Sequence, residues 1–498
     1  MRIRISIAAS IGVLALASAA TAQVIVDAAR TGNRQAVRAA IAKKVDVNAA
    51  AVDGTTALLV VADADDLETA QLLLTAGANP KAANRYGVAP ITVAARNGNS
   101  ALVDALVRAG ADANTATPGG ETVLMTAARS GNGAVVRALL ARGANANARE
   151  AWFEQTALMW AASDNQAAVM RTLIEAGADV NARAKVLPGQ PPRPRNSDTA
   201  FQAAHSNFPK GGFTPLLFAA QYGAMDAVRA LADAKADLNL ADPDGITPMM
   251  MAIVNGHYDV AAELLRKGAN VNAVDRSGRG ALFFTVDMHS LEWLFSRPNP
   301  QPSGEMDSVA LAKLLLESGA NANARLTARG FILHHNASGN ANLIGGSTPL
   351  MKAATTSDVT MMRMLIEHGA DPNITTQNHT TPMMAAAGLN WADISSLGTE
   401  AETIAAITLL IQHGADVNAF NDLGETALHG AAQRGADKVV QLLADRGARL
   451  DAKTRRGRTP LDEAMGQAAE NDPEVRSPER KSTQVLLRQL MERRVAAR

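Results

Sequence analysis

The chain has no cysteine, and aromatic residues make up only 3% of its 498 positions. Without cysteine it can form neither disulfide bridges nor a thiolate nucleophile. With few aromatic rings, its elements must pack mainly through Ala, Leu, Val and Met. It also lacks a phosphate-binding glycine loop, a dinucleotide fingerprint and an H-E-x-x-H motif. The sequence therefore predicts no catalytic residues, no metal site, no cofactor and no enzyme activity.

Net charge is also missing, because 48 basic side chains balance 48 acidic ones. The charges are dispersed, apart from a mildly basic final segment. A nucleic-acid-binding protein needs a basic face. We therefore expect no nucleic-acid partner.

What the chain does have is a repeated triplet, Gly-Ala-Asp/Asn, at the end of apolar segments. Clear copies begin at Gly77, Gly110, Gly143, Gly177, Gly268, Gly319, Gly369 and Gly414, and degenerate copies begin at Lys44, Lys235 and Gly447. The copies at Lys44, Gly77, Gly110 and Gly143 follow one another at intervals of 33 residues. A fixed period of this length indicates a stacked array rather than a conventional globular core.

A second signature, Gly-x-Thr-Pro/Ala-Leu, opens most periods, as at Gly212 to Leu216. Thr is a good helix N-cap, and Pro is tolerated in the first turn. An Ala-Ala pair follows, which is small enough for two helices to pack closely. A second apolar helix then ends at the Gly of Gly-Ala, which suits a left-handed C-cap. The sequence thus predicts two helices and a tight turn per period.

These units resemble ankyrin repeats in the order and spacing of their motifs. We count twelve, beginning near residues 24, 54, 87, 120, 154, 212, 245, 278, 346, 379, 424 and 457. The resemblance implies an all-α solenoid of helix-turn-helix units with hairpin-like loops. The family's His after Leu is kept only at His429, and Met, Leu, Thr or Phe replaces it elsewhere. The hydrogen bonds that this His gives between neighbouring repeats must then be absent or replaced.

The N-terminus has the pattern of a cleavable signal peptide. Arg2 and Arg4 precede an apolar run from Ile5 to Ala17, and Ala20-Thr21-Ala22 forms a cleavage site. We expect cleavage after Ala22, no stable membrane insertion afterwards, and a periplasmic or secreted protein of a bacterium. The predicted organisation is a signal peptide over 1–22, the array over 23–478 and a C-terminal capping helix over 479–498.

Insertions interrupt the period at 185–211, 297–307, 326–345 and 388–401. The first and third extend hairpins, and the second and fourth separate the two helices of a unit. Insertions in repeat proteins often lie on the binding face, but surface loops also lengthen at small entropic cost. His205 and the pair His334 and His335 lie in the two hairpin insertions and would bind a metal only with further ligands.

Candidate contact residues occupy the hairpin tips and the positions after each Ala-Ala, which should line the concave side. Tyr, Trp and Arg are the types that dominate interface energetics. Trp160 and Phe218 are instead expected in the core. The predicted protein-binding residues are Arg85, Tyr86, Arg96, Arg129, Trp152, Phe153, Phe213, Gln221, Tyr222, Asn255, Arg276 and Arg434.

The sequence therefore favours a monomeric, non-enzymatic scaffold that binds one or more proteins through the groove and hairpins of an ankyrin-type array. Two alternatives stay open at this point. The insertion loops could bind a metal or a small ligand, or the protein could be an effector exported to a host cell.

Overall fold

The computed structural model describes residues 24–188, 210–290, 301–327, 343–389, 398–466 and 479–496, and the backbone of 468–469 and 472–476. Contacts divide the chain into two compact units. Unit 1 comprises Met1–Leu187 with Gly211–Asp242, and unit 2 comprises Pro188–Lys210 with Pro243–Arg498. The predicted signal peptide and most of each predicted insertion lie outside the described residues. Their boundaries, and those of the array, stay predictions.

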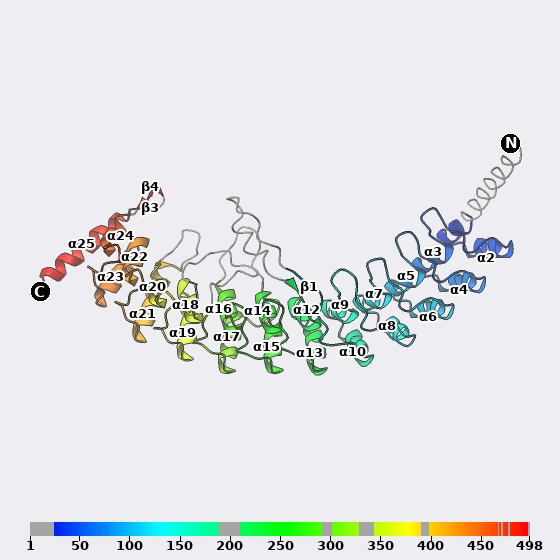
Figure 1. Ribbon diagram of the computed structural model, residues 1–498, viewed down its shortest axis with the longest axis horizontal. Coiled ribbons are helices and arrows are strands. Elements are labelled where there is room, and N and C mark those ends of the chain that lie inside the picture. The colour runs from blue at the N-terminus through cyan, green and yellow to red at the C-terminus, as the bar shows by residue number, and fades with distance from the viewer. Residues whose placement is uncertain are drawn as a thin grey trace. The chain divides into compact units, whose positions relative to one another are not determined.

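Unit 1 consists mainly of consecutive helix pairs, each packed against the next (Figure 1). After a helical turn over 24–30, its helices are α2 (Arg34–Ala42), α3 (Ala57–Asp63), α4 (Leu67–Thr75), α5 (Pro90–Asn97), α6 (Ser100–Arg108), α7 (Val123–Arg129), α8 (Gly133–Leu140), α9 (Ala157–Ser163), α10 (Ala167–Glu175), α12 (Pro215–Gln221) and α13 (Met225–Asp233). Two short strands, β1 (Val186–Leu187) and β2 (Lys210–Gly211), border residues 189–209.

Unit 2 repeats the same pairing of helices. Its helices are α14 (Pro248–Val254), α15 (Tyr258–Arg266), α16 (Ala281–His289), α17 (Ser308–Glu317), α18 (Pro349–Thr355), α19 (Val359–Glu367), α20 (Pro382–Ala386), α21 (Glu400–Gln412), α22 (Ala427–Arg434), α23 (Asp437–Asp445), α24 (Pro460–Ala464) and α25 (Lys481–Ala496). The strands β3 (Ala468–Ala469) and β4 (Asp472–Arg476) pair antiparallel. The prediction of an all-α solenoid is confirmed.

The first helix of each pair begins as its sequence predicts. In α12 the Thr214 hydroxyl accepts a hydrogen bond from the Leu217 N–H at 3.2 Å, and Pro215 fills the first turn. Thr348 caps α18 in the same way through the N–H of Met351. Such a cap satisfies one of the N–H groups that a helix start leaves without a partner. The Thr-Pro signature therefore sets where these inner helices start.

The core lies between the paired helices. The Ala-Ala pairs of α5 and α7 are fully buried, so small side chains bring neighbouring helices close together. In unit 2 a continuous apolar cluster extends from Leu282 on α16 to Leu490 on α25. Because a single pair cannot bury its apolar surface alone, stability depends on stacking.

Hairpins connect each pair to the next and stack on one another. The N–H of Ala151 donates to the carbonyl of Gly119 at 2.9 Å, and the N–H of Arg276 donates to that of Asp244 at 2.9 Å. Gly120 has a positive φ of 80°, and a Cβ there would lie 2.9 Å from the Ala151 nitrogen. The recurring hairpin Gly is thus needed both for its φ and for the close approach of the next hairpin.

A ladder of asparagine side chains supplies further bonds between repeats. Asn114 donates through Nδ2 to the Gly143 carbonyl at 3.1 Å, and its Oδ1 accepts from the Asn145 N–H at 2.8 Å. Asn323 makes the same two bonds to the Gly369 carbonyl and the Asp371 N–H. Where the Asn of Gly-Ala-Asp-x-Asn is present, as at Asn114 and Asn323, it therefore ties its repeat to the next one, and the loss of the family's His does not leave these repeats unlinked.

His429, the one copy of the family's His, forms hydrogen bonds both within its repeat and to the next repeat. Its Nδ1 accepts from the Thr426 N–H at 3.1 Å, and its Nε2 lies 3.2 Å from the Arg458 carbonyl. Burial lowers the pKa of His429. At the equivalent place in α7, the Met125 sulfur accepts from the Thr122 N–H at 3.4 Å and so replaces only the bond within the repeat.

No helix within the described ranges combines the length and apolar character that crossing a membrane requires.

Candidate functional site

The candidate site of unit 1 is built around two half-buried aromatic side chains on neighbouring inner helices. Trp160 lies on α9 and Phe218 on α12, at equivalent positions of their repeats. Both pack against a small cluster of Met159, Ala182 and Ala184. The expectation that they are core residues is only half right, since one side of each packs inward while part of the ring stays accessible.

Polar and aromatic neighbours hold these rings in place. The Trp160 Nε1–H donates to Gln155 Oε1 at 2.8 Å. The guanidinium of Arg129, at the end of α7, lies 5.6 Å from the Trp160 ring centroid, within cation–π range. Phe213 meets Phe218 edge-to-face, with ring centroids 5.4 Å apart and an interplanar angle of 65°. Phe213 is therefore half-buried and partly structural.

The hairpin before α9 presents two exposed rings, Trp152 and Phe153, which are 72% and 52% accessible. The buried carboxylate of Glu150 shapes this turn. It accepts hydrogen bonds from the N–H groups of Trp152, Phe153 and Gln155 at 2.7, 2.8 and 3.0 Å. The carbonyl of Phe153 also accepts from the Lys185 N–H at 2.7 Å. Both rings thus project from a backbone held by several bonds.

Tyr222, the C-cap residue of α12, adds a third exposed ring, with Gln221 directly before it. We call the six aromatic residues on these hairpins and inner helices the aromatic face. The aromatic face comprises Trp152, Phe153, Trp160, Phe213, Phe218 and Tyr222. Exposed aromatic side chains grouped over neighbouring repeats are typical of surfaces that bind other proteins.

The other predicted residues of unit 1 lie in earlier repeats. Arg85 stacks over the ring of Tyr86 with 4.8 Å to its centroid, at an exposed hairpin tip. Arg96 lies in the last turn of α5 and pairs with Asp63 at 2.6 Å on the surface. These side chains are accessible to a partner, and the structure places them on hairpins and inner-helix ends as the sequence predicts.

The three predicted residues of unit 2 all make bonds within the protein. Asn255 Nδ2 donates to the Met251 carbonyl at 2.8 Å, and Arg276 pairs with Asp244 at 3.3 Å. Arg434 is half-buried and donates to the Gly398 carbonyl at 3.0 Å and to Thr403 Oγ1 at 3.2 Å. Burial lowers the pKa of Arg434. Arg434 therefore ties α22 to the residues that precede and begin α21.

Burial raises the pKa values of three acidic groups among the described residues. Burial raises the pKa of the Tyr258 hydroxyl to about 12, and the charge of Asp307 adds to this. Burial also raises the pKa of Glu463, although Arg458 lies 3.4 Å away and opposes the shift. Burial raises the pKa of Asp244 in the same way, against the charge of Arg276. Each of these groups belongs to a packed contact between elements.

Among the residues that the structure describes, no three His, Asp or Glu side chains come together as a metal site would require. The histidines weighed as possible ligands, His205, His334 and His335, lie outside these residues.

Comparison with known proteins covers most of the described chain. Residues 25–117, 91–184, 195–275 and 305–397 match the family described as ankyrin repeats (3 copies), and residues 410–464 match ankyrin repeats (many copies). Together the matches span well over half of the sequence.

Similar curated proteins match only part of this chain. Ankyrin repeat and SOCS box protein 18 of Homo sapiens is 32% identical over 147 residues, which is 25% of this chain and 32% of the relative. B-cell lymphoma 3 protein homolog of Mus musculus is 27% identical over 188 residues, or 37% of this chain and 34% of the relative. Alpha-latrocrustotoxin-Lt1a of Latrodectus tredecimguttatus is 33% identical over 116 residues, or 23% and 7%. The aligned stretches thus span about a third or less of each relative.

Proposed function

The chain belongs to the ankyrin repeat family, and from this premise we propose that it is a non-enzymatic scaffold that binds a partner protein. The binding surface is the aromatic face of unit 1, with Arg129 and the exposed Arg85, Tyr86 and Arg96 of earlier repeats as further contacts. Stacked repeats provide extended surfaces that other proteins bind.

The observation that carries this proposal is the exposure of large rings on a fixed backbone. Trp152, Phe153 and Tyr222 are each more than half accessible, although burying such rings would stabilise the protein. Because Glu150 already fixes the turn that carries Trp152 and Phe153, a partner would not have to order it. Rigid aromatic anchors lose little conformational entropy on binding.

The test is a binding experiment with the tagged chain, in which partners are crosslinked mildly in an extract of the source cells and identified by mass spectrometry. The triple variant Trp152→Ala/Phe153→Ala/Tyr222→Ala should then bind the purified partner at least about tenfold more weakly, because interface aromatics act as hot spots. Its far-ultraviolet circular dichroism should be unchanged, since these rings are exposed.

Val485→Ser on α25 is the matched control, because it also removes an exposed apolar side chain. It should leave the affinity unchanged. Equal affinity of the triple variant and the unsubstituted chain would overturn the assignment of the aromatic face.

We also propose that the protein is bacterial and is exported to the periplasm or beyond. Support comes from the arginines, apolar run and Ala20-Thr21-Ala22 site of its first residues. N-terminal sequencing of the protein from the periplasmic fraction should find Gln23 first. A mature chain that keeps Met1 and stays in the cytoplasmic fraction would contradict this.

A further inference from the structure

Two kinds of hydrogen bond tie neighbouring repeats along the edge of the array that carries the loops and hairpins. In the loop tie, an Asn side chain bonds the backbone of the next loop, as Asn114 does with Gly143 and Asn145. In the hairpin tie, the N–H of one hairpin donates to the hairpin before it, as Ala151 does to the Gly119 carbonyl at 2.9 Å. Both ties hold successive repeats in a fixed orientation.

One step of unit 1 lacks the loop tie. Lys81, in the loop between α4 and α5, occupies the position that Asn114 holds one period later. An asparagine there would donate to the Gly110 carbonyl and accept from the Asp112 N–H. Lysine has no acceptor atom for that N–H, and among the described residues no side-chain bond of Lys81 reaches the loop after α6. The repeat of α3 and α4 is therefore not tied in this way to the repeat of α5 and α6.

The same step also lacks the hairpin tie. Pro118 aligns with Ala151, the donor of the next hairpin, and with Arg85, the donor of the previous one. Arg85 donates to the Asp53 carbonyl at 2.9 Å, but proline has no N–H to donate. The Pro118 ring instead lies directly against Gly87. We call this the untied step. Within the described part of unit 1, every other step keeps at least its loop tie, formed by Asn48, Asn114, Asn147 and Asn181.

The other end of the helices at the untied step is well bonded. There the turn between α5 and α6 contacts the turn between α3 and α4. Arg96 pairs with Asp63 at 2.6 Å, and Asn97 Nδ2 donates to the Asp63 carbonyl at 3.0 Å. Asn99 Nδ2 donates to Asp65 Oδ1 at 2.7 Å. The two repeats are thus bonded at their turns but not at their loops, so rotation about the turns would break none of these ties.

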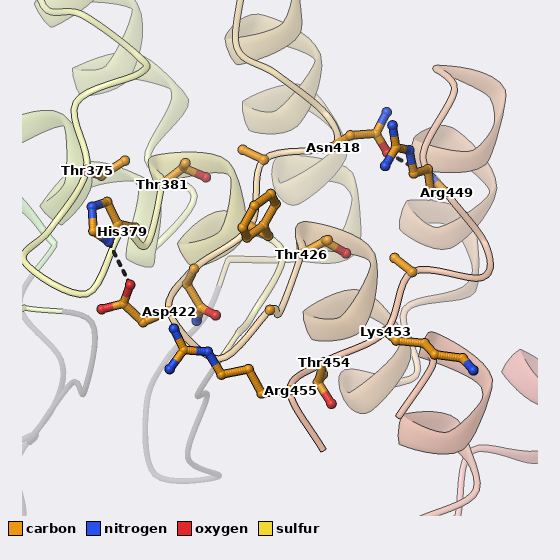
Figure 2. Close-up of a pocket in the computed structure, with 15 residues that line it drawn as sticks. Thr375, His379, Thr381, Asn418, Asp422, Thr426, Arg449, Lys453, Thr454 and Arg455 are labelled. Carbon is orange, nitrogen blue, oxygen red and sulfur yellow. Dashed lines mark hydrogen bonds and ion pairs between the residues drawn. The ribbon is translucent and has the colours of Figure 1, made fainter. Parts of the chain in front are cut away.

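A fully tied step of unit 2 shows what is missing. Two of its neighbouring hairpins, one after α19 and the next after α21, border the cavity drawn in Figure 2. The Asp422 N–H donates to the Asn378 carbonyl at 3.0 Å. His379 Nδ1 also lies 2.8 Å from Asp422 Oδ1, as the dashed line shows. The loop tie of the same step runs from Asn373 to the Gly414 carbonyl. Tied hairpins of this kind cannot separate without losing several polar contacts.

We propose that the untied step is a hinge, about which the first repeats of unit 1 rotate relative to the rest of that unit. The turns of Asp63 and Asn97 form its axis, and the loops that contain Lys81 and Pro118 move apart and together. Hinges are a few residues at loops and element ends that absorb such rotations. This inference depends only on the bonds of the step and not on the proposed binding role.

The hinge has a consequence for the proposed function, on which this consequence rests. The hairpin of Arg85 and Tyr86 is bonded to the hairpin before it, so it moves with the first repeats. The aromatic face and Arg129 lie on the other side of the untied step. Rotation at the hinge therefore changes the separation between these two groups of contact residues, and one array can fit partners of different width.

The experiment measures the distance distribution between two spin labels by double electron–electron resonance. Since the chain has no cysteine, Val52→Cys and Ala151→Cys provide the only labelling sites. Both positions are exposed, and they are equivalent hairpin positions 99 residues apart, on either side of the untied step. Packed helices lie about 8–10 Å apart, so the labels should be roughly 30 Å from each other.

The matched control pair is Val274→Cys with Phe420→Cys in unit 2. These exposed hairpin residues also span three steps, each of which has both ties. The pair in unit 1 should give a wider distribution than the control pair. Adding Lys81→Asn and Pro118→Ala supplies the missing acceptor and N–H, so the excess width should be lost. Lys81→Ala removes the same lysine without supplying an acceptor and should leave the width unchanged.

Amide exchange gives a second readout that needs no labels. In Lys81→Asn alone, the Asp112 N–H should exchange about fivefold more slowly, the factor for one net hydrogen bond of about 1 kcal/mol. Equal widths for the two label pairs in the parent chain would overturn the hinge. A width that persists in Lys81→Asn/Pro118→Ala, or that is lost in Lys81→Ala, would overturn it too. Because none of these measurements involves a partner, failure of the hinge and failure of the aromatic face are distinguishable.

Discussion

Replacing Asp287 with alanine is expected to destabilise unit 2 by about 3–5 kcal/mol, because it leaves a buried ammonium group without its partner. Lys352 on α18 is only 1% exposed, and its Nζ lies 3.2 Å from Asp287 Oδ1 on α16. A charge in this position cannot recover its hydration when the carboxylate is removed. Urea unfolding followed by circular dichroism, with amide exchange measured over α16 and α18, would detect the loss.

Two further variants separate the effect of the buried charge from that of the lost side chain. The double variant Asp287→Ala/Lys352→Met should recover most of the stability, since replacing both members of a buried pair is often nearly neutral. Asp63→Ala removes one member of the exposed Arg96–Asp63 pair, where both side chains are about 60% accessible. That variant should cost at most about 1 kcal/mol. If Asp287→Ala is as mild as Asp63→Ala, the ammonium group reaches water and the burial argument fails.

The second large effect is expected from Gly430→Ala in α22. In a helix interior this change normally stabilises a protein by about 0.5–1 kcal/mol, because alanine loses less backbone entropy on folding. Here a Cβ would lie 2.6 Å from the nitrogen and 3.0 Å from the Cα of Leu389. A backbone neighbour cannot rotate away as a side chain can. We therefore expect a net destabilisation of about 1–3 kcal/mol, the usual cost of overpacking.

Gly133→Ala is the matched control, at the first residue of α8. The nearest atom to a Cβ there is Arg137 Nη1 at 3.4 Å, the far end of a flexible side chain. That variant should leave stability unchanged or raise it by up to about 1 kcal/mol. Thermal unfolding of both variants would decide the sign. A Gly430→Ala protein more stable than the parent would mean that α20 and α22 can move apart at low cost.

Gly430 also shows the limit of reading a repeat position by position. The aligned residue is Trp160 in α9, Phe218 in α12 and Lys352 in α18. The sequence pattern places all of them on an inner helix but does not say which are covered. Leu389, which crowds Gly430, lies in the turn after α20, at the start of the insertion over 388–401. Insertions therefore change the surroundings of a position without changing the repeat pattern.

The candidate site could be predicted only in part, because the repeat pattern gives the place of each residue but not which neighbours cover it. Hairpin tips and inner-helix ends follow from the period, so Tyr86, Trp152 and Tyr222 lie exposed as the pattern predicts. Arg434 follows the same pattern, yet it is half-buried because Gly398 and Thr403 accept its hydrogen bonds. Gly398 lies in the insertion over 388–401, and Thr403 lies on α21 just after it, so no sequence periodicity indicated that contact.

By itself, the sequence determined the array of paired helices, their starts at Thr-Pro, their ends at Gly and the hairpins between them. These features depend on residues within one turn or one repeat, and local hydrogen bonding and steric limits decide them. Only the tertiary structure decided that Asn side chains tie the repeats together, that Lys352 is buried, that Trp160 and Phe218 keep an accessible side, and that Asp63 and Asp65 bond the turns at the untied step. Those outcomes depend on contacts beyond a single helix or turn, where the burial of each side chain is set by what neighbouring elements and repeats place over it.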